Sequence, residues 1–144
     1  MKRLIKDVVA GQIPLVAEPS ISVREATQRM TDRNVGALLL VENSKLVGIF
    51  SERDVMKKVV AAGINPDLTP VSEVMAKKIV TITPERRLAE ALHLMREGHF
   101  RHVPVVDAQG RPVGMVSARD ALSGDLADFE QEIRRMDELE EIIG

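Results

Sequence analysis

The length, composition and charge of this chain of 144 residues exclude several classes of function. With no Cys, the sequence excludes disulfide frameworks, thiolate zinc sites and thiol nucleophiles, while a net charge of −2 and an aromatic content of 2% argue against nucleic-acid binding. The first residues lack the apolar stretch of a signal peptide and no run reaches the roughly 18 apolar residues of a membrane helix, so we expect a soluble, cytoplasmic protein without a membrane partner.

The chain contains one unit twice. The segment 48–54, Gly-Ile-Phe-Ser-Glu-Arg-Asp, returns as Gly-Met-Val-Ser-Ala-Arg-Asp over residues 114–120. The second copy gains a residue where Asn43-Ser44 becomes Ala108-Gln109-Gly110, a natural place for a hairpin turn to lengthen. We therefore expect a first repeat over residues 4–62, a linker over 63–70 and a second repeat over 71–123.

Each copy begins with a lead-in and a short extended stretch, over residues 14–17 and 79–82, and a helix follows. In the first copy the helix carries apolar residues at helical spacing from Val23 to Met30, behind a capping box formed by Ser22 and Glu25. In the second copy Thr83-Pro84 is the expected cap and first-turn proline.

Two apolar β runs joined by a tight turn come next in each copy, at 37–41 with 46–50 and at 103–106 with 113–116. Their continuous apolar character is typical of strands that are covered on both faces. A second helix begins at each Ser-x-Arg-Asp motif. Each repeat therefore has the order β-α-β-β-α, which predicts an α+β protein with a pseudo-symmetric body and related crevices where its halves meet.

The tail over residues 124–144 is predicted to be a C-terminal amphipathic helix, because its apolar residues lie three or four positions apart. These residues are Leu126, Phe129, Ile133, Met136, Leu139 and Ile143. Such a helix packs either on its own domain or against a partner chain in a homodimer, and the sequence leaves both possibilities open.

The lead-in, helix, apolar hairpin and closing Gly-h-h-Ser-x-x-Asp motif resemble the CBS-domain family over about residues 4–122. The second copy fits closely, with Val103-Pro104-Val105-Val106-Asp107 ahead of its closing motif, whereas the first copy lacks the proline. The chain is similar to a tandem CBS pair, or Bateman module, of the small stand-alone bacterial or archaeal type. This resemblance implies two repeats packed pseudo-symmetrically through their sheets into a disc that commonly dimerises, with adenosine nucleotides in the clefts between the repeats.

The two Ser-x-Arg-Asp motifs combine a helix cap with a cation. A Ser followed three residues later by an Asp caps a helix, but an Arg in the first turn opposes the helix dipole and is not explained by capping. An anionic ligand would reconcile the two, because backbone N–H groups and Arg hold phosphate and a carboxylate accepts from ribose hydroxyls. We therefore favour a ligand site over capping alone.

In liganded members of the family the ribose Asp of one repeat faces the adenine pocket of the other. Carried onto this chain, one site joins Ser51, Arg53 and Asp54 to Ile79, Val80, Thr81, Arg101, His102 and Val103. The other site joins Ser117, Arg119 and Asp120 to Ile13, Leu15, Val16, Gly36 and Ala37.

The two sites are expected to differ in their grip on phosphate. The family often places basic residues just before the hydrophobic-Pro-hydrophobic stretch, and Arg101 and His102 occupy those positions in the second repeat. The first repeat has Gly36 and Ala37 there. We therefore expect the Asp120 cleft to lack a phosphate grip, and to bind weakly, to take an uncharged adenosyl compound or to stay empty.

The leading hypothesis is a cytoplasmic, non-enzymatic adenosine-nucleotide sensor that forms a homodimer and regulates an unknown protein partner. AMP is the first candidate ligand, followed by ATP, ADP, NAD or an S-adenosyl compound, and no covalent cofactor is expected. His99 and His102 have no Cys or third His nearby in the sequence, so we expect no metal site. The alternative is a ligand-independent module for dimerisation or protein interaction.

Overall fold

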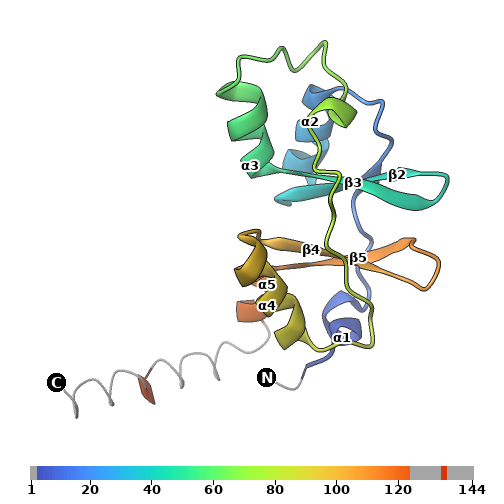
Figure 1. Ribbon diagram of the computed structural model, residues 1–144, viewed down its shortest axis with the longest axis vertical. Helices are drawn as coiled ribbons and strands as arrows, with labels where there is room; N and C mark the ends of the chain where they lie inside the picture. Colours follow the sequence, from blue (N-terminus) through green and yellow to red (C-terminus); the bar gives the residue numbers. More distant parts are fainter. Residues whose placement is uncertain (1–2, 124–133, 136–144) are drawn as a thin grey trace.

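Two lobes stacked through their sheets form the protein in this computed structural model, which describes residues 3–123 and 134–135 (Figure 1). The two β-hairpins lie next to each other in the middle of the molecule, and the helices lie on the outer faces. This arrangement confirms the predicted α+β class with two repeats. The C-terminal helix predicted over 124–144 lies outside the described residues, apart from positions 134 and 135.

The elements follow the predicted order with one exception. The first half contains α1 (Ile5–Val9), β1 (Val16–Ala17), α2 (Val23–Arg33), β2 (Ala37–Glu42), β3 (Lys45–Ser51), α3 (Glu52–Asp54) and the π-helical segment η1 (Val55–Val60). The second half contains the 3₁₀ turn η2 (Val71–Glu73), α4 (Leu88–Gly98), β4 (His102–Val106), β5 (Pro112–Ser117) and α5 (Ala118–Ser123). None of the helices described is long and apolar enough to cross a membrane.

The exception is the extended stretch expected over residues 79–82, which forms no strand in the described part of the chain. Only an isolated parallel bridge joins Ile82 to Val105. The Ile82 N–H donates to Pro104 O and the Val106 N–H donates to Ile82 O, at 3.0 Å each. Pairing stops at that residue, and Ile79 and Val80 line a cavity instead.

The two sheets share one hairpin design. In the first, β1 pairs parallel with β2 and β2 pairs antiparallel with β3; in the second, β4 pairs antiparallel with β5. Each hairpin has an irregular register near its turn, at Leu40/Val41 and at Val105/Val106. Asn43 and Ser44 turn the first hairpin with positive φ angles of 51° and 65°, as a two-residue turn of this kind requires.

The lead-in segments are exchanged between the lobes. Ile5 and Val9 of α1 belong to the buried core of the second repeat, whereas Val71 and Val74, which follow the linker, belong to the core of the first. A Cβ atom on Gly114 of β5 would lie 2.7 Å from Val9, so α1 packs directly on the second hairpin. The repeat boundaries 4–62 and 71–123 therefore remain a prediction about the sequence units, while each core contains part of the other unit.

The caps of the two long helices differ. Ser22 Oγ accepts a hydrogen bond from the Glu25 N–H at 3.1 Å, which is the first half of the capping box predicted for α2, and the Glu25 carboxylate pairs with Arg29 at 3.3 Å. The cap predicted at Thr83-Pro84 is wrong, because α4 begins only at Leu88 and has no side-chain cap. The Pro84 carbonyl instead accepts from the N–H of Lys6 in the exchanged helix α1, at 2.9 Å.

Candidate functional site

Two cavities lie between the lobes, one beside each Ser-x-Arg-Asp motif. The Asp54 pocket has a volume of about 420 Å³ and the Asp120 pocket one of about 460 Å³. The Asp54 pocket is lined by Ile49, Ser51, Glu52, Arg53, Asp54, Met56, Ala76, Lys78, Ile79, Val80, His99, Phe100, Arg101, His102 and Pro104. Both cavities therefore draw residues from the two repeats.

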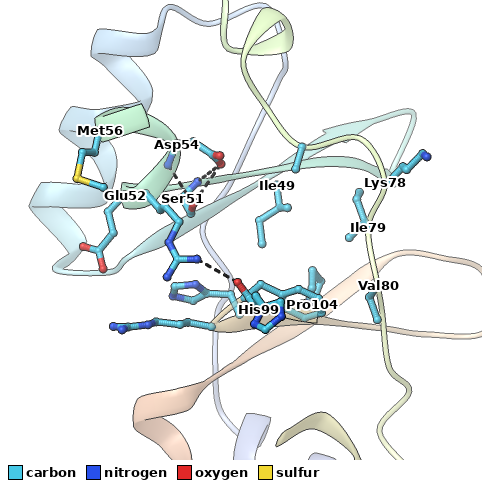
Figure 2. Close-up of a pocket in the computed structure, with 15 residues that line it drawn as sticks. Ile49, Ser51, Glu52, Asp54, Met56, Lys78, Ile79, Val80, His99 and Pro104 are labelled. Carbon is cyan, nitrogen blue, oxygen red and sulfur yellow. Dashed lines mark hydrogen bonds between the residues drawn. The ribbon is translucent and has the colours of Figure 1, made fainter. Parts of the chain in front are cut away.

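Three chain segments build the Asp54 pocket (Figure 2). The end of β3 and the start of α3 supply Ser51 and Asp54, and the irregular segment after η2 supplies Ile79 and Val80 on another side. The third segment runs from the end of α4 into β4 and supplies His99 and Pro104. The pocket thus has a polar end at a helix start and an apolar wall across the lobe boundary.

Each motif forms the reciprocal cap that the sequence suggests. Asp54 Oδ2 accepts from the Ser51 N–H at 2.9 Å and from its Oγ at 3.1 Å, while the Asp54 N–H donates to Ser51 Oγ at 3.3 Å. Ser117 and Asp120 repeat the pattern at 2.7, 3.1 and 3.3 Å. In Asp54 the second oxygen, Oδ1, pairs with Lys58 Nζ at 3.2 Å. This oxygen lies outside the cap, where it is able to accept from another donor.

Arg53 links the two lobes across this pocket. One nitrogen of its guanidinium, Nη1, donates to the carbonyl oxygen of His99 at 3.0 Å, drawn as a dashed line in Figure 2. His99 ends α4 in the left-handed conformation, with φ 57°. The first-turn cation that capping does not explain therefore has a structural partner in the opposite repeat.

Most of the residues predicted for the first site meet in the Asp54 pocket. Ser51, Arg53, Asp54, Ile79, Val80, Arg101 and His102 all line it. Two do not. The Val103 side chain is fully buried in the core of the second repeat, and Thr81 faces a separate surface hollow beside α4. The alternation of side chains along an extended chain turns these two away from the cavity.

The residues predicted for the second site also lie together in one pocket, with one exception. Ile13, Leu15, Gly36, Ala37, Ser117, Arg119 and Asp120 line the Asp120 pocket. Val16 does not; it pairs with Leu39 in the parallel ladder of β1 and β2. Sequence reasoning missed further lining residues, namely Gln12, Pro14, Arg33, Asn34, Val35, Glu52, Arg101, His102, Met115 and Ala118.

The Asp120 pocket was expected to lack the phosphate grip that Arg101 and His102 give the other cleft, yet both residues line it as well. Arg101 and His102 line both pockets, and Arg33 adds a cation to the second, where its Nη2 donates to Ile13 O at 2.6 Å. The family resemblance assigned Arg101 and His102 to one cleft, because it treats the two clefts as separate. The start of β4 instead lies between the pockets, so its side chains reach both.

The central wall, defined here as Glu52, Arg101 and His102, separates the two pockets. A Cβ atom on Gly36 would lie 3.1 Å from Glu52 Oε1 and 3.2 Å from His102 Nε2. The absence of a side chain at Gly36 therefore lets Glu52 of the first repeat and His102 of the second come close to one another.

The imidazole of His102 is disfavoured as a cation. Burial lowers the pKa of His102 below its ordinary value of 6.5, against the opposing effects of Glu52 and Asp120 and with smaller contributions from Arg101 and Arg119. At neutral pH the wall therefore contains a neutral imidazole together with one guanidinium and one carboxylate.

The described residues form no cluster of three metal-ligating side chains. His99 and His102 both line the Asp54 pocket but are the only imidazoles there among the described residues. The arrangement combines an apolar wall, hydrogen-bond acceptors and cations, which suits a ligand with a flat apolar part, hydroxyl groups and a negative charge.

Comparison with known proteins identifies the family. The model of the CBS domain matches residues 5–61 and 71–126. A mitochondrial CBS domain-containing protein of Arabidopsis thaliana, CBSX3, is 35% identical over 120 residues; the match covers 80% of this chain and 58% of that protein, so the chain spans less than two thirds of this relative.

Two solved structures share the fold. The CBS domain structure of NE2398 is 29% identical, with a TM-score of 0.81, and the match covers 88% of this chain and 99% of that one. The CBS domain pair of MJ0100, solved with 5′-methylthioadenosine and S-adenosyl-L-methionine, is 29% identical with a TM-score of 0.74 and coverage of 84% and 94%. The chain therefore belongs to the CBS-domain family, with two CBS domains in tandem.

Proposed function

We propose that this CBS pair is a regulatory module that binds an adenosine-type ligand in the Asp54 pocket. The observation that carries the proposal is the composition of this pocket, in which the apolar wall comes from one repeat and the Ser51–Asp54 cap from the other. The ligands of the similar CBS pair of MJ0100 both contain an adenosyl group. A bound nucleoside would bridge the repeats and so would favour one relative arrangement of them.

Each part of such a ligand has a suitable neighbour in the pocket. Ile79, Val80 and Pro104 offer an apolar wall to a purine, and Asp54 Oδ1 offers an acceptor to ribose hydroxyls. Arg101 offers a forked donor to phosphate. AMP is the first ligand to test because it is the smallest of the candidates that contain all three parts. ATP, ADP and NAD also contain all three, S-adenosyl compounds contain the purine and the ribose without a phosphate, and these are the next candidates.

Binding of AMP to the whole chain tests the proposal by isothermal titration calorimetry. We expect Asp54→Asn, which keeps an oxygen for the cap, to weaken AMP binding by about ten-fold to a hundred-fold, because hydrogen bonds to a charged group contribute about 1.5–3 kcal/mol. Asp67→Asn is the matched control, since Asp67 pairs with Arg24 on the surface and lines neither pocket. Absence of heat with AMP, adenosine and S-adenosylmethionine at millimolar concentrations would remove the proposal.

Regulation, rather than catalysis, is the role that we propose for this binding. The effect of a ligand on the two lobes is limited by the difference in its affinity for their arrangements, and a protein partner would respond to that difference. The homodimer, the cytoplasmic location and the identity of the partner remain predictions from the sequence.

A ligand-independent interaction module is the second candidate function. The hydrogen bond from Arg53 to His99 O favours it, because it joins the lobes through protein atoms alone. Measuring self-association or partner binding with and without AMP separates the two. Equal affinities under both conditions favour the interaction module, and a change on adding AMP favours the sensor.

A further inference from the structure

The central wall lines both pockets. We infer that its Arg101 is a specificity residue shared by the two pockets. Because it has a single guanidinium, a phosphorylated ligand bound in one pocket weakens the binding of a phosphorylated ligand in the other. This inference rests on the proposed function, since it concerns two ligands of the class proposed for the Asp54 pocket. It adds a second phosphorylated ligand in the Asp120 pocket and a negative coupling between them.

The backbone fixes Arg101 while its side chain remains available. The Arg101 carbonyl accepts from the Ala118 N–H at 2.9 Å, and the residue next to it, His102, begins β4. In the described part of the chain the Arg101 side chain is exposed and makes no hydrogen bond or ion pair. A guanidinium held at its base and unpaired at its tip is able to turn toward either cavity.

The other cations of the cavities do not serve both. Among the described residues, Arg53 and Lys78 line only the Asp54 pocket, and Arg33 and Arg119 line only the Asp120 pocket. Arg53 and Arg33 already donate to backbone carbonyls, those of His99 and Ile13. Arg101 is therefore the one permanently charged cation of the described chain that both pockets share.

His102 does not replace Arg101 in this role at neutral pH. Its imidazole lies beside Gly36 and Glu52 and is partly buried, and the charged groups that act on it are Glu52, Asp120, Arg101 and Arg119. Glu52 contributes a negative charge to the wall, which opposes phosphate on either side of it. When Arg101 binds the phosphate of one ligand, the rest of the wall is therefore unfavourable to a second phosphate.

Two effects then act in the same direction. A forked guanidinium binds one phosphate best when both of its N–H pairs face that phosphate, so it cannot give the same contact to a second phosphate on its other side. Two phosphates in pockets that share these lining residues also repel each other. A nucleoside without phosphate experiences neither effect. By linkage, the weakening is the same whichever pocket is filled first.

The coupling is measured by comparing the whole chain with two single-pocket variants. Val80→Trp fills the Asp54 pocket and Ile13→Trp fills the Asp120 pocket; both residues line their pocket and are exposed, at 41% and 78%, so the indole has room without entering the core. Calorimetric titration of each variant with AMP gives the intrinsic constant of the open pocket. The product of these two association constants is the overall association constant expected for filling both pockets of the unaltered chain if the pockets do not influence each other.

We expect double occupancy of the unaltered chain by AMP to be about ten-fold weaker than that product, and double occupancy by adenosine to equal it. In Arg101→Gln the AMP association constants of both pockets fall, and the discrepancy with the product shrinks to the part that is due to repulsion between the two phosphates. Arg96→Gln is the control, because Arg96 is an exposed arginine of α4 that lines neither pocket. Binding of a single AMP to the unaltered chain also supports the inference if each single-pocket variant binds AMP in its open pocket.

Several results would overturn the inference and leave the proposed function intact. These are double occupancy equal to the product, a discrepancy of undiminished size in Arg101→Gln, a discrepancy of the same size with adenosine, or AMP binding in only one of the two single-pocket variants. No binding of AMP or adenosine to any form of the chain would instead reject the proposed function itself, and the inference with it.

Discussion

Asp54 illustrates how one side chain supports both the fold and the site. Its Oδ2 atom closes the cap with Ser51, and its Oδ1 atom pairs with Lys58, a half-exposed lysine whose Nζ also donates to Val74 O. The first of these contacts stabilises the start of α3, and the second contact is open to exchange for a ligand hydroxyl. The sequence motif alone left capping and ligand binding as competing explanations, whereas the geometry allows both in the same carboxylate.

His102 makes the stability of the fold depend on pH. Its pKa is lowered in the folded chain, mainly by burial, so between that lowered value and 6.5 the unfolded chain binds a proton that the folded chain does not. We therefore expect the free energy of unfolding to have its higher value above pH 6.5 and to decrease as the pH drops below 6.5. Urea titrations at pH 7.5 and pH 5.5 measure this loss.

Replacement of the imidazole separates this effect from other titrating groups. In His102→Gln the loss of unfolding free energy between pH 7.5 and pH 5.5 should be smaller than in the unaltered chain. His93→Gln serves as the control, because His93 is exposed on α4. An equal loss in His102→Gln and in the unaltered chain would show that the charged groups around His102 compensate its burial.

At the scale of elements, the exchange of lead-in segments ties each repeat to the other. Helix α1 has only five residues and is too short to be stable alone, so its position depends on burial of Ile5 and Val9 against the second repeat. Its backbone is joined there too, with the Ile5 N–H donating to Arg86 O at 2.8 Å. The two repeats are therefore separate units in sequence but not in packing.

Shortening Ile5 tests this exchange. Ile5 is fully buried, so Ile5→Ala should lower the free energy of unfolding by about 2–5 kcal/mol. The loss should act on the second repeat, and hydrogen exchange should accelerate more in β4 and β5 than in β2 and β3. Lys6→Ala, at an exposed position of the same helix, is the control. Faster exchange confined to the first hairpin would contradict the exchange of segments.

The sequence predicted elements well where local pattern and packing agree. The apolar spacing and cap of α2 and the paired runs of both hairpins are local signals, and the structure has them where expected. The helix after Ser51 was expected as well, but the segment Val55–Val60 is π-helical, with the Ala61 N–H donating to Met56 O. Met56, which lines the Asp54 pocket, was missed because no local signal distinguishes this wider turn from an α-helix.

At the scale of the whole molecule, the duplication predicts two related pockets but not how they meet. The repeat and the family resemblance predict the residues of each motif, the apolar wall at Ile79 and Val80, and the crossed arrangement of the two sites. The central wall does not follow, because alignment of the repeats compares equivalent positions and contains no information on contacts between them. Glu52, His102 and Gly36 meet only because the lobes stack through their sheets.

The central claim is that an adenosine-type ligand binds across both repeats at the Asp54 pocket, and hydrogen–deuterium exchange of the whole chain with and without AMP tests it most directly. The account predicts simultaneous protection of residues 51–56 in the first repeat and of residues 76–80 and 99–104 in the second, with the protection reduced in Asp54→Asn. Protection confined to one repeat at a saturating AMP concentration, or no protection at all, would contradict it.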